Sequence, residues 1–187
     1  MDGSRKSNLQ AGADPTASAA ERARAWLGLV APWWGLAGIL ALLAFAIVRL
    51  SPLALDAFRV GLSGSQWAAL ALSGVLMTYF EGYRGFQRSF SPRVAERAAG
   101  LRESPAPVRV ILAPFYCAGY FAASRRVKIT AYSVLIGVVV LIQLVHFLAQ
   151  PWRGIVDFGV VLGLAWGLAA TGVLTVRALE GARTREA

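Results

Sequence analysis

The sequence predicts an all-α integral membrane protein: four transmembrane helices in one bundle, plus a short interfacial helix and an interfacial or re-entrant helix. The first indication is composition, since 57% of the 187 residues are hydrophobic, 16% are charged and the mean hydropathy is +0.55. Soluble domains are nearer half apolar and a quarter charged. Second, apolar runs of about 20 residues, enough to cross a bilayer, recur along the chain. Third, the basic residues gather at the ends of these runs and in one connecting segment, as membrane topology requires.

Residues 1–18 are small and polar, and we expect a disordered cytoplasmic N-terminus there. Ser18 and Glu21 match a capping box, so the transmembrane domain, residues 19–179, is expected to open with a helix. The first span is predicted at about 26–48, because this run carries no charge. A cleaved signal peptide is the competing interpretation, but its apolar core is shorter, about 7–15 residues, and lies nearer the chain start.

The next predicted elements are an interfacial helix over 52–62 and a second span over about 67–86. Ser51 and Pro52 are a helix cap followed by a first-turn proline, and the apolar spacing after them is typical of a helix lying on the membrane surface. Only 14 residues from Trp67 onward are free of charge. Because a span needs roughly 20 residues, the second span is expected to carry charged side chains into the membrane.

Beyond the second span, prolines and basic residues interrupt the chain as far as Lys128. Within this segment the apolar stretch 110–123 is too short for a span and is expected to form an interfacial or re-entrant helix. The third span is predicted at about 129–149 and the fourth at about 154–176, joined by a tight turn. Residues 180–187 are expected to form a polar, basic cytoplasmic tail.

The distribution of arginine and lysine predicts that both termini are cytoplasmic. Sixteen of the 19 basic residues lie in the N-terminus, the segment 81–128 and the tail, and three lie in the connections on the other side. This asymmetry is the positive-inside pattern of multi-pass membrane proteins. Nearly all of the basic residues are arginine, which indicates a GC-rich bacterial genome and hence the bacterial inner (plasma) membrane.

The fourth predicted span carries the clearest packing signal, the glycines Gly159, Gly163 and Gly167. At helical pitch they form one flat strip that another helix can approach closely. The strip suits either an interface with a second copy or a partner subunit, or packing within the monomer, and the sequence leaves both open. Because polar side chains occupy other faces of this helix, we expect it at the centre of the bundle.

A polar pair is predicted near the outer surface, where the third and fourth spans meet. His146 and Asp157 lie equally far from the turn that joins these spans, so an antiparallel hairpin puts them at the same depth, with Gln143 on the face of His146. Such a pair suits proton relay, binding of a quinone head group or pH sensing. The alternative is a structural pair in which Arg153 neutralises Asp157 at spacing i, i+4.

A second candidate site combines an intramembrane acid with basic residues. Glu81 is expected roughly 9 Å inside the cytoplasmic edge of the membrane and within pairing distance of Arg84 at i+3. The residues expected to form a basic ring beneath the aromatic 110–123 segment are Arg84, Arg88, Arg109, Arg125, Arg126 and Lys128. The ring suits an anionic-lipid or polyprenyl-phosphate head group, although ordinary positive-inside anchoring also explains it.

At FEGYRGFQRSFSPRVAERA, APFYCAGYFAASRR and QPWRGIVDFGVVLGLAWG, the chain resembles a group of small multi-pass bacterial membrane proteins. The resemblance covers about residues 80–167 and implies a bacterial integral membrane protein, with no activity to carry over. The paired aspartates of prenyltransferases and CDP-alcohol phosphotransferases are absent from the sequence, as is the CxxC of membrane disulfide oxidoreductases.

These observations predict a non-enzymatic membrane protein, an accessory, scaffold or assembly subunit that docks through the glycine strip. The alternative is a protein that binds or handles an anionic lipid or polyprenyl phosphate through the basic ring. A proton-coupled carrier or quinone-binding enzyme using the His–Asp pair comes third, because one histidine and one cysteine give few catalytic groups. We expect no cofactor, metal or nucleic-acid partner, since no residue cluster has metal-ligand spacing and the basic residues follow membrane topology.

Overall fold

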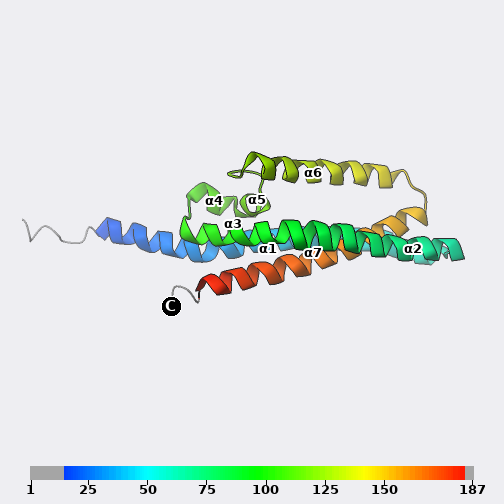
Figure 1. Cartoon of the computed structure of the whole chain (residues 1–187), viewed down its shortest axis with the longest axis horizontal. Helices are drawn as coiled ribbons and strands as arrows, with labels where there is room; N and C mark the ends of the chain where they lie inside the picture. The colour runs from blue at the N-terminus through cyan, green and yellow to red at the C-terminus, as the bar shows by residue number, and fades with distance from the viewer. Residues whose placement is uncertain (1–14, 184–187) are drawn as a thin grey trace, which may run out of the picture.

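The computed structural model describes residues 15–183, and this part of the chain consists of helices and short connections (Figure 1). Three helices are long and apolar enough to cross a membrane, by length and composition: Glu21–Val60, Arg125–His146 and Trp152–Gly181. The all-helical prediction is confirmed for the described residues, and these three helices contain most or all of the predicted first, third and fourth spans. The fourfold count stays a prediction, because the helix that contains 67–86 is not among them.

The predicted terminal segments are only partly described. Helix α1 begins at Pro15, so residues 15–18 are helical rather than disordered, and a proline is favourable in a first helical turn because its missing N–H has no partner to lose there. The rest of the predicted disordered segment, 1–14, lies outside the described residues. At the other end the last helix continues to Arg183, and 184–187 likewise lie outside the described part.

Helix α1, Pro15–Val60, is one continuous helix of 46 residues that contains both the predicted first span and the predicted interfacial helix. The separate helix over 52–62 is therefore wrong. Pro52 has no N–H to donate, yet the helix continues through it, and the preceding Ser51 hydroxyl donates to the carbonyl of Ile47 at 2.7 Å. Ala57 beyond it is fully buried, so packing against the rest of the protein holds this stretch in line.

Helices α2 (Gly64–Met77), η1 (Thr78–Phe90) and α3 (Ser91–Glu103) follow one another without a gap and form a second long rod. η1 is a π-helix, a wider form with i→i+5 hydrogen bonds that rarely exceeds one turn. The rod contains the predicted second span and continues past Pro92, where the sequence indicated an interruption. Pro92 lies at the start of α3, the position at which a helix best tolerates proline.

The stretch expected to be one helix over 110–123 is two short helices, α4 (Pro107–Ile111) and α5 (Ala113–Ala118). Pro114 explains the division, because it cannot donate the backbone hydrogen bond that would continue α4 into α5. α5 packs against α1 and α3, and its Tyr116 and Cys117 side chains are buried. α5 is thus part of the packed core, whereas α4 has no buried residue.

Helix α7, Trp152–Arg183, lies at the centre of the fold and contacts α1, α2, η1 and α3 along its length. This agrees with the central position expected for the fourth predicted span. Buried polar side chains add to the packing: the Ser91 and Thr171 hydroxyls, which join α3 to α7, lie 2.9 Å apart. The core of the protein is therefore built from α1, the α2–η1–α3 rod and α7.

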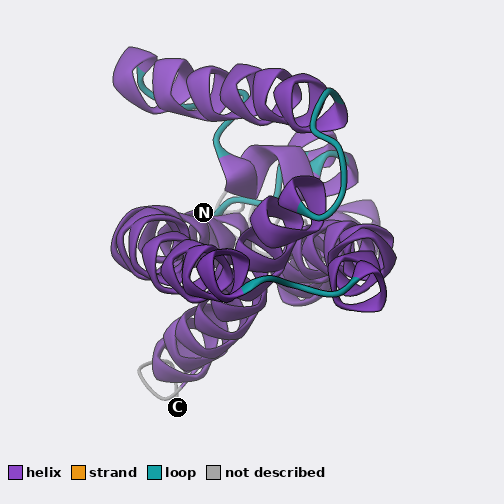
Figure 2. Ribbon diagram, turned by 90° about the vertical axis from the view of Figure 1, so that its right-hand side faces the viewer, coloured by secondary structure: helices purple, strands orange, loops and turns teal. Residues whose placement is uncertain are grey.

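Helix α6, Arg125–His146, stands apart from these three (Figures 1 and 2). Val145 is its one buried residue among those of the helix, and a ring contact between Tyr132 and Tyr120, with centroids 5.5 Å apart, holds its other end. The single bundle of four packed helices is not what the structure has. Apolar side chains cover most of α6 and Val145 is its one buried residue, so little close packing draws this helix against the others.

Candidate functional site

The glycine strip of α7 is filled by the same chain. A Cβ on Gly159 would lie 2.9 Å from the Ser73 carbonyl oxygen of α2, and one on Gly163 would lie 3.0 Å from a carboxylate oxygen of Glu81. On Gly167 it would lie 2.5 Å from the Phe86 ring of η1. Of the two uses that the sequence left open, the structure has packing within the monomer, and the strip presents no free face for a partner.

Glu81 faces α7 across the strip instead of pairing with Arg84. The structure has no ion pair between the two, and Arg84 is exposed. The π-helix is the reason: with roughly 4.4 residues per turn, residue i+3 lies about a third of a turn away from residue i. The expected i, i+3 pair depended on an α-helix, so this prediction was wrong.

The structure gives contacts for two of the residues predicted to form a basic ring. Arg88 lies over the Tyr83 ring, 5.7 Å from its centroid, and Arg109 lies 5.6 Å from the Tyr116 centroid. Arg125 and Arg126 are exposed at the start of α6. The ring itself stays a prediction, and Arg88 keeps an exposed charge beside an aromatic surface.

The structure does not bring His146 and Asp157 together. His146 and Gln143 are exposed on α6, while Asp157 is 5% exposed within the bundle. The charge beside Asp157 is Arg153, four residues earlier, whose Nε lies 3.8 Å from Oδ2, and neither of these two atoms has a hydrogen-bond partner. This is the structural pair that was the alternative to a functional His–Asp pair. The proton-relay hypothesis needs His146 beside Asp157, and the structure does not have that contact.

Gln150, just before α7, has a structural role that the sequence analysis missed. Its Oε1 accepts a hydrogen bond from the Gly154 backbone N–H at 3.2 Å, and its Nε2 donates to the Leu53 carbonyl of α1 at 3.3 Å. A Cβ on Gly154 would lie 2.6 Å from that of Ala57. Gln150 thus caps α7 and fixes it against the part of α1 that was expected to be a separate helix.

Arg97 of α3 is a second residue that the sequence analysis missed. Its Nε donates to the Tyr116 carbonyl at 2.5 Å and its Nη2 donates to the Phe121 and Ala122 carbonyls at 2.8 and 3.3 Å. The guanidinium also lies over the Tyr116 ring, 4.0 Å from the centroid. Ala122 has a positive φ of 48°, so Arg97 binds the backbone where the chain is forced into an unfavourable turn. Arg97 lies in one of the three segments that resemble small multi-pass bacterial membrane proteins. That resemblance was the only signal for it in the sequence.

Cys117 of α5 should be inert in the folded protein. Its side chain is 1% exposed and packs on Gly35 of α1, where a Cβ would lie 2.9 Å from Sγ. A reagent dissolved in water cannot reach the thiol while α5 stays packed, because almost none of the Cys117 surface is exposed.

We therefore expect maleimide to label Cys117 in native membranes roughly 100-fold more slowly than in denatured protein, because packing shields the thiol from the reagent. Mass spectrometry of timed samples, before and after denaturation in SDS, measures both rates. Equal rates in the two states would show that α5 does not pack as described.

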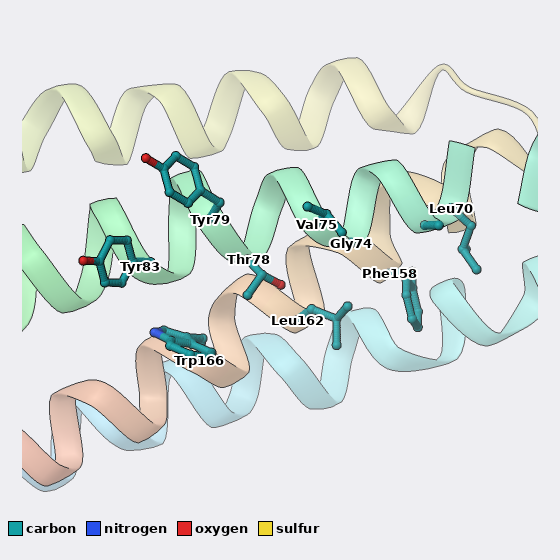
Figure 3. A pocket seen from close by; sticks show the side chains of 10 residues that line it. Leu70, Gly74, Val75, Thr78, Tyr79, Tyr83, Phe158, Leu162 and Trp166 are labelled. Carbon is teal, nitrogen blue, oxygen red and sulfur yellow. The ribbon is translucent and has the colours of Figure 1, made fainter. Parts of the chain in front are cut away.

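A groove of about 600 Å³ lies between the α2–η1 rod and α7 (Figure 3). Helix α1 contributes no lining residue. The walls are formed by Leu70, Ala71, Gly74 and Val75 of α2, Thr78, Tyr79 and Tyr83 of η1, and Phe158, Leu162 and Trp166 of α7. The indole N–H of Trp166 already donates to Gln87 at 2.8 Å. The groove therefore offers an apolar surface with few free polar atoms.

The described residues contain no group of three or more His, Cys, Asp or Glu side chains placed to hold a metal ion. No family model, curated protein or solved structure matches the chain. Its function must therefore be argued from its own residues, chiefly the unpacked helix α6, the arginine contacts and the groove.

Proposed function

We propose that this chain is a non-enzymatic integral membrane subunit that docks with another membrane protein through helix α6. In this proposal α1, the α2–η1–α3 rod, α6 and α7 all cross the membrane, with both termini in the cytoplasm of a bacterial cell. The arrangement in Figure 1 supports this topology, since the start of α1, the end of α3, the start of α6 and the end of α7 lie at one end of the molecule. Basic residues gather in these parts: Arg22 and Arg24, Arg97 and Arg102, Arg125, Arg126 and Lys128, and Arg177 and Arg183.

The observation that carries the proposal is the lack of packing around α6. Transmembrane helices associate through close van der Waals contact and interhelical hydrogen bonds, usually at small residues. The other long helices achieve this within the chain, where the α7 glycines meet the rod. On α6, Ser133 and Gly137 form a small-x-x-x-small pair that is exposed, and a Cβ on Gly137 would have no atom within 4 Å. The free small-residue surface is thus on α6, not on α7.

Gln143 lies on an adjacent face of the same helix, about 80° around it from Ser133. It lies on α6 about one turn before the end of the helix and is exposed. A polar side chain within a transmembrane helix normally faces protein or water and finds a partner there. Since Gln143 finds none in the described part of this chain, the hydrogen-bonding groups of a second membrane helix would satisfy it.

The short helix α5 is proposed to enter the membrane from the cytoplasmic side. It packs on Gly35 and Gly38 of α1, which lie roughly 14–18 Å along the helix from Trp26. If 26–48 crosses the membrane, α5 is level with the middle of that span. Non-helical backbone at such a depth needs partners within the protein, and Arg97 supplies them for three carbonyls.

A leucine in place of Gly137 tests the docking surface. We expect Gly137→Leu to abolish a complex that the wild-type chain forms in its native membranes, with the thermal stability of the chain unchanged, because nothing in the monomer lies within 4 Å of that position. Val138→Leu is the matched control, since Val138 is also exposed on α6 but lies about 100° or more around the helix from Ser133, Gly137 and Gln143. Native mass spectrometry after gentle extraction measures the complex.

Retention of the complex in Gly137→Leu would contradict the proposal. If the complex contained only copies of this chain, the partner at α6 would be a second copy rather than another protein. A bare wild-type monomer, extracted under conditions that preserve other membrane complexes, would remove the docking role altogether.

A further inference from the structure

We propose that the groove between the α2–η1 rod and α7 binds one acyl chain of an anionic phospholipid, whose phosphate lies at Arg88. This site is separate from the docking surface on α6 and does not depend on it. Its occupant is a lipid of the surrounding bilayer rather than a soluble ligand. The walls of the groove, its opening and the charge at one end all suit such a lipid.

The walls suit a hydrocarbon chain. No lining residue is charged, and aromatic or aliphatic side chains from both helices form most of the surface. The Trp166 N–H is already bonded to Gln87, so it does not need a polar ligand. The small Ala71 leaves the wall low beside the facing α7, while Gly74 is filled by Leu162, 3.1 Å from where its Cβ would be. The hydroxyls of Thr78, Tyr79 and Tyr83 also line the groove, but a charged group there would lose its hydration without meeting an opposite charge.

The groove is open along the side that would face lipid. Val75, Tyr79 and Trp166 at its rim are 68%, 52% and 46% exposed, and α2, η1 and α7 supply all the lining residues. From Leu70 to Tyr83 the rod rises roughly 20 Å, which exceeds the roughly 15 Å of one leaflet. An acyl chain can therefore enter sideways from the bilayer and lie along the groove (Figure 3).

The charge at one end indicates an anionic head group. Arg88 lies over the Tyr83 ring, 5.7 Å from its centroid, and Tyr83 is a lining residue of the groove. Arg88 is exposed and is engaged by no carboxylate in the described part of the chain. Glu81, the nearest acid along the rod, faces Gly163 and is not a lining residue. A phosphate at Arg88 would thus meet an unneutralised cation directly beside the apolar groove.

The experiment uses the full-length chain in nanodiscs that contain phosphatidylcholine with a small fraction of phosphatidylglycerol, the phosphatidylglycerol carrying brominated acyl chains. Bromine quenches tryptophan fluorescence at close range. The difference in quenching between the wild-type chain and Trp166→Phe measures the quenching of Trp166, which lines the groove. Ala71→Phe fills the groove, whereas Ala68→Phe makes the same change on the same helix at an exposed residue outside it. Arg88→Gln removes the cation, and Arg93→Gln is its charge-matched control.

We expect quenching of Trp166 by phosphatidylglycerol to be lost in Ala71→Phe and kept in Ala68→Phe. The amount of phosphatidylglycerol needed for half-quenching should rise about fivefold in Arg88→Gln and stay unchanged in Arg93→Gln. Equal quenching by brominated phosphatidylcholine would overturn the anionic specificity. Equal quenching in Ala71→Phe and Ala68→Phe would show that the acyl chain does not lie in the groove. A protein helix or a polyprenyl phosphate found in the groove in place of the phospholipid would also overturn the proposal.

Discussion

Gly159→Leu is expected to destabilise the folded protein by about 2–3 kcal/mol, as over-packing does in a closely packed interior. A Cβ at this position would lie 2.9 Å from the Ser73 backbone oxygen and 3.0 Å from Met77 Cγ. A backbone atom cannot move aside as the end of a side chain can, so α2 and α7 must separate. Because α7 is the helix that α1, η1 and α3 also contact, the separation would loosen the whole core.

The control for this prediction is on the same helix. A Cβ on Gly172 would meet only Leu40 Cδ1, at 3.9 Å, which is ordinary contact. Gly172→Leu should therefore leave stability within about 0.5 kcal/mol of wild type, after allowance for the higher helix propensity of leucine. Unfolding in SDS, followed by circular dichroism, compares the two. If both variants are equally stable, the glycine strip does not hold α2 against α7.

Arg97→Lys is the second large effect that we expect. The arginine side chain serves three backbone carbonyls and one aromatic ring at once. A lysine ammonium is a point charge and lacks the planar fork needed to bind them together. Leaving such acceptors without donors should cost about 3 kcal/mol, concentrated in the segment that contains α5 and the turn after it.

The measurement uses the cysteine that this segment covers. In Arg97→Lys we expect maleimide to reach Cys117 at least ten times faster than in wild type, because loosening α5 exposes a thiol that is 1% exposed in the structure. Arg93→Lys is the control, since the Arg93 side chain bonds only the Ser89 carbonyl, four residues earlier in the same rod, among the described contacts. Unchanged labelling in Arg97→Lys would show that Arg97 does not hold the segment.

The sequence by itself determined the helical class and three membrane-length helices, because long apolar runs leave few other structures open to the backbone in lipid. It also located the glycine strip and the central helix, since helical pitch converts spacing directly into a shared face. These conclusions depend only on local periodicity and length. Local rules failed where contacts with a distant part of the chain outweighed them. Ser51 and Pro52 have the pattern of a helix start, but the helix continues through them, and Gln150 and Gly154 pack against α1 just beyond, at Leu53 and Ala57.

Tertiary structure alone decided which polar groups meet. The Glu81–Arg84 pair and the His146–Asp157 pair were expected from α-helical spacing and from a packed hairpin. The π-helix changes the angle between residues 81 and 84, and α6 stands away from the bundle, so neither pair forms. Arg97, which binds carbonyls 19 to 25 residues away, has no local signal at all. Contacts of this kind follow from how rigid helices pack, and a sequence pattern that covers one turn cannot contain them.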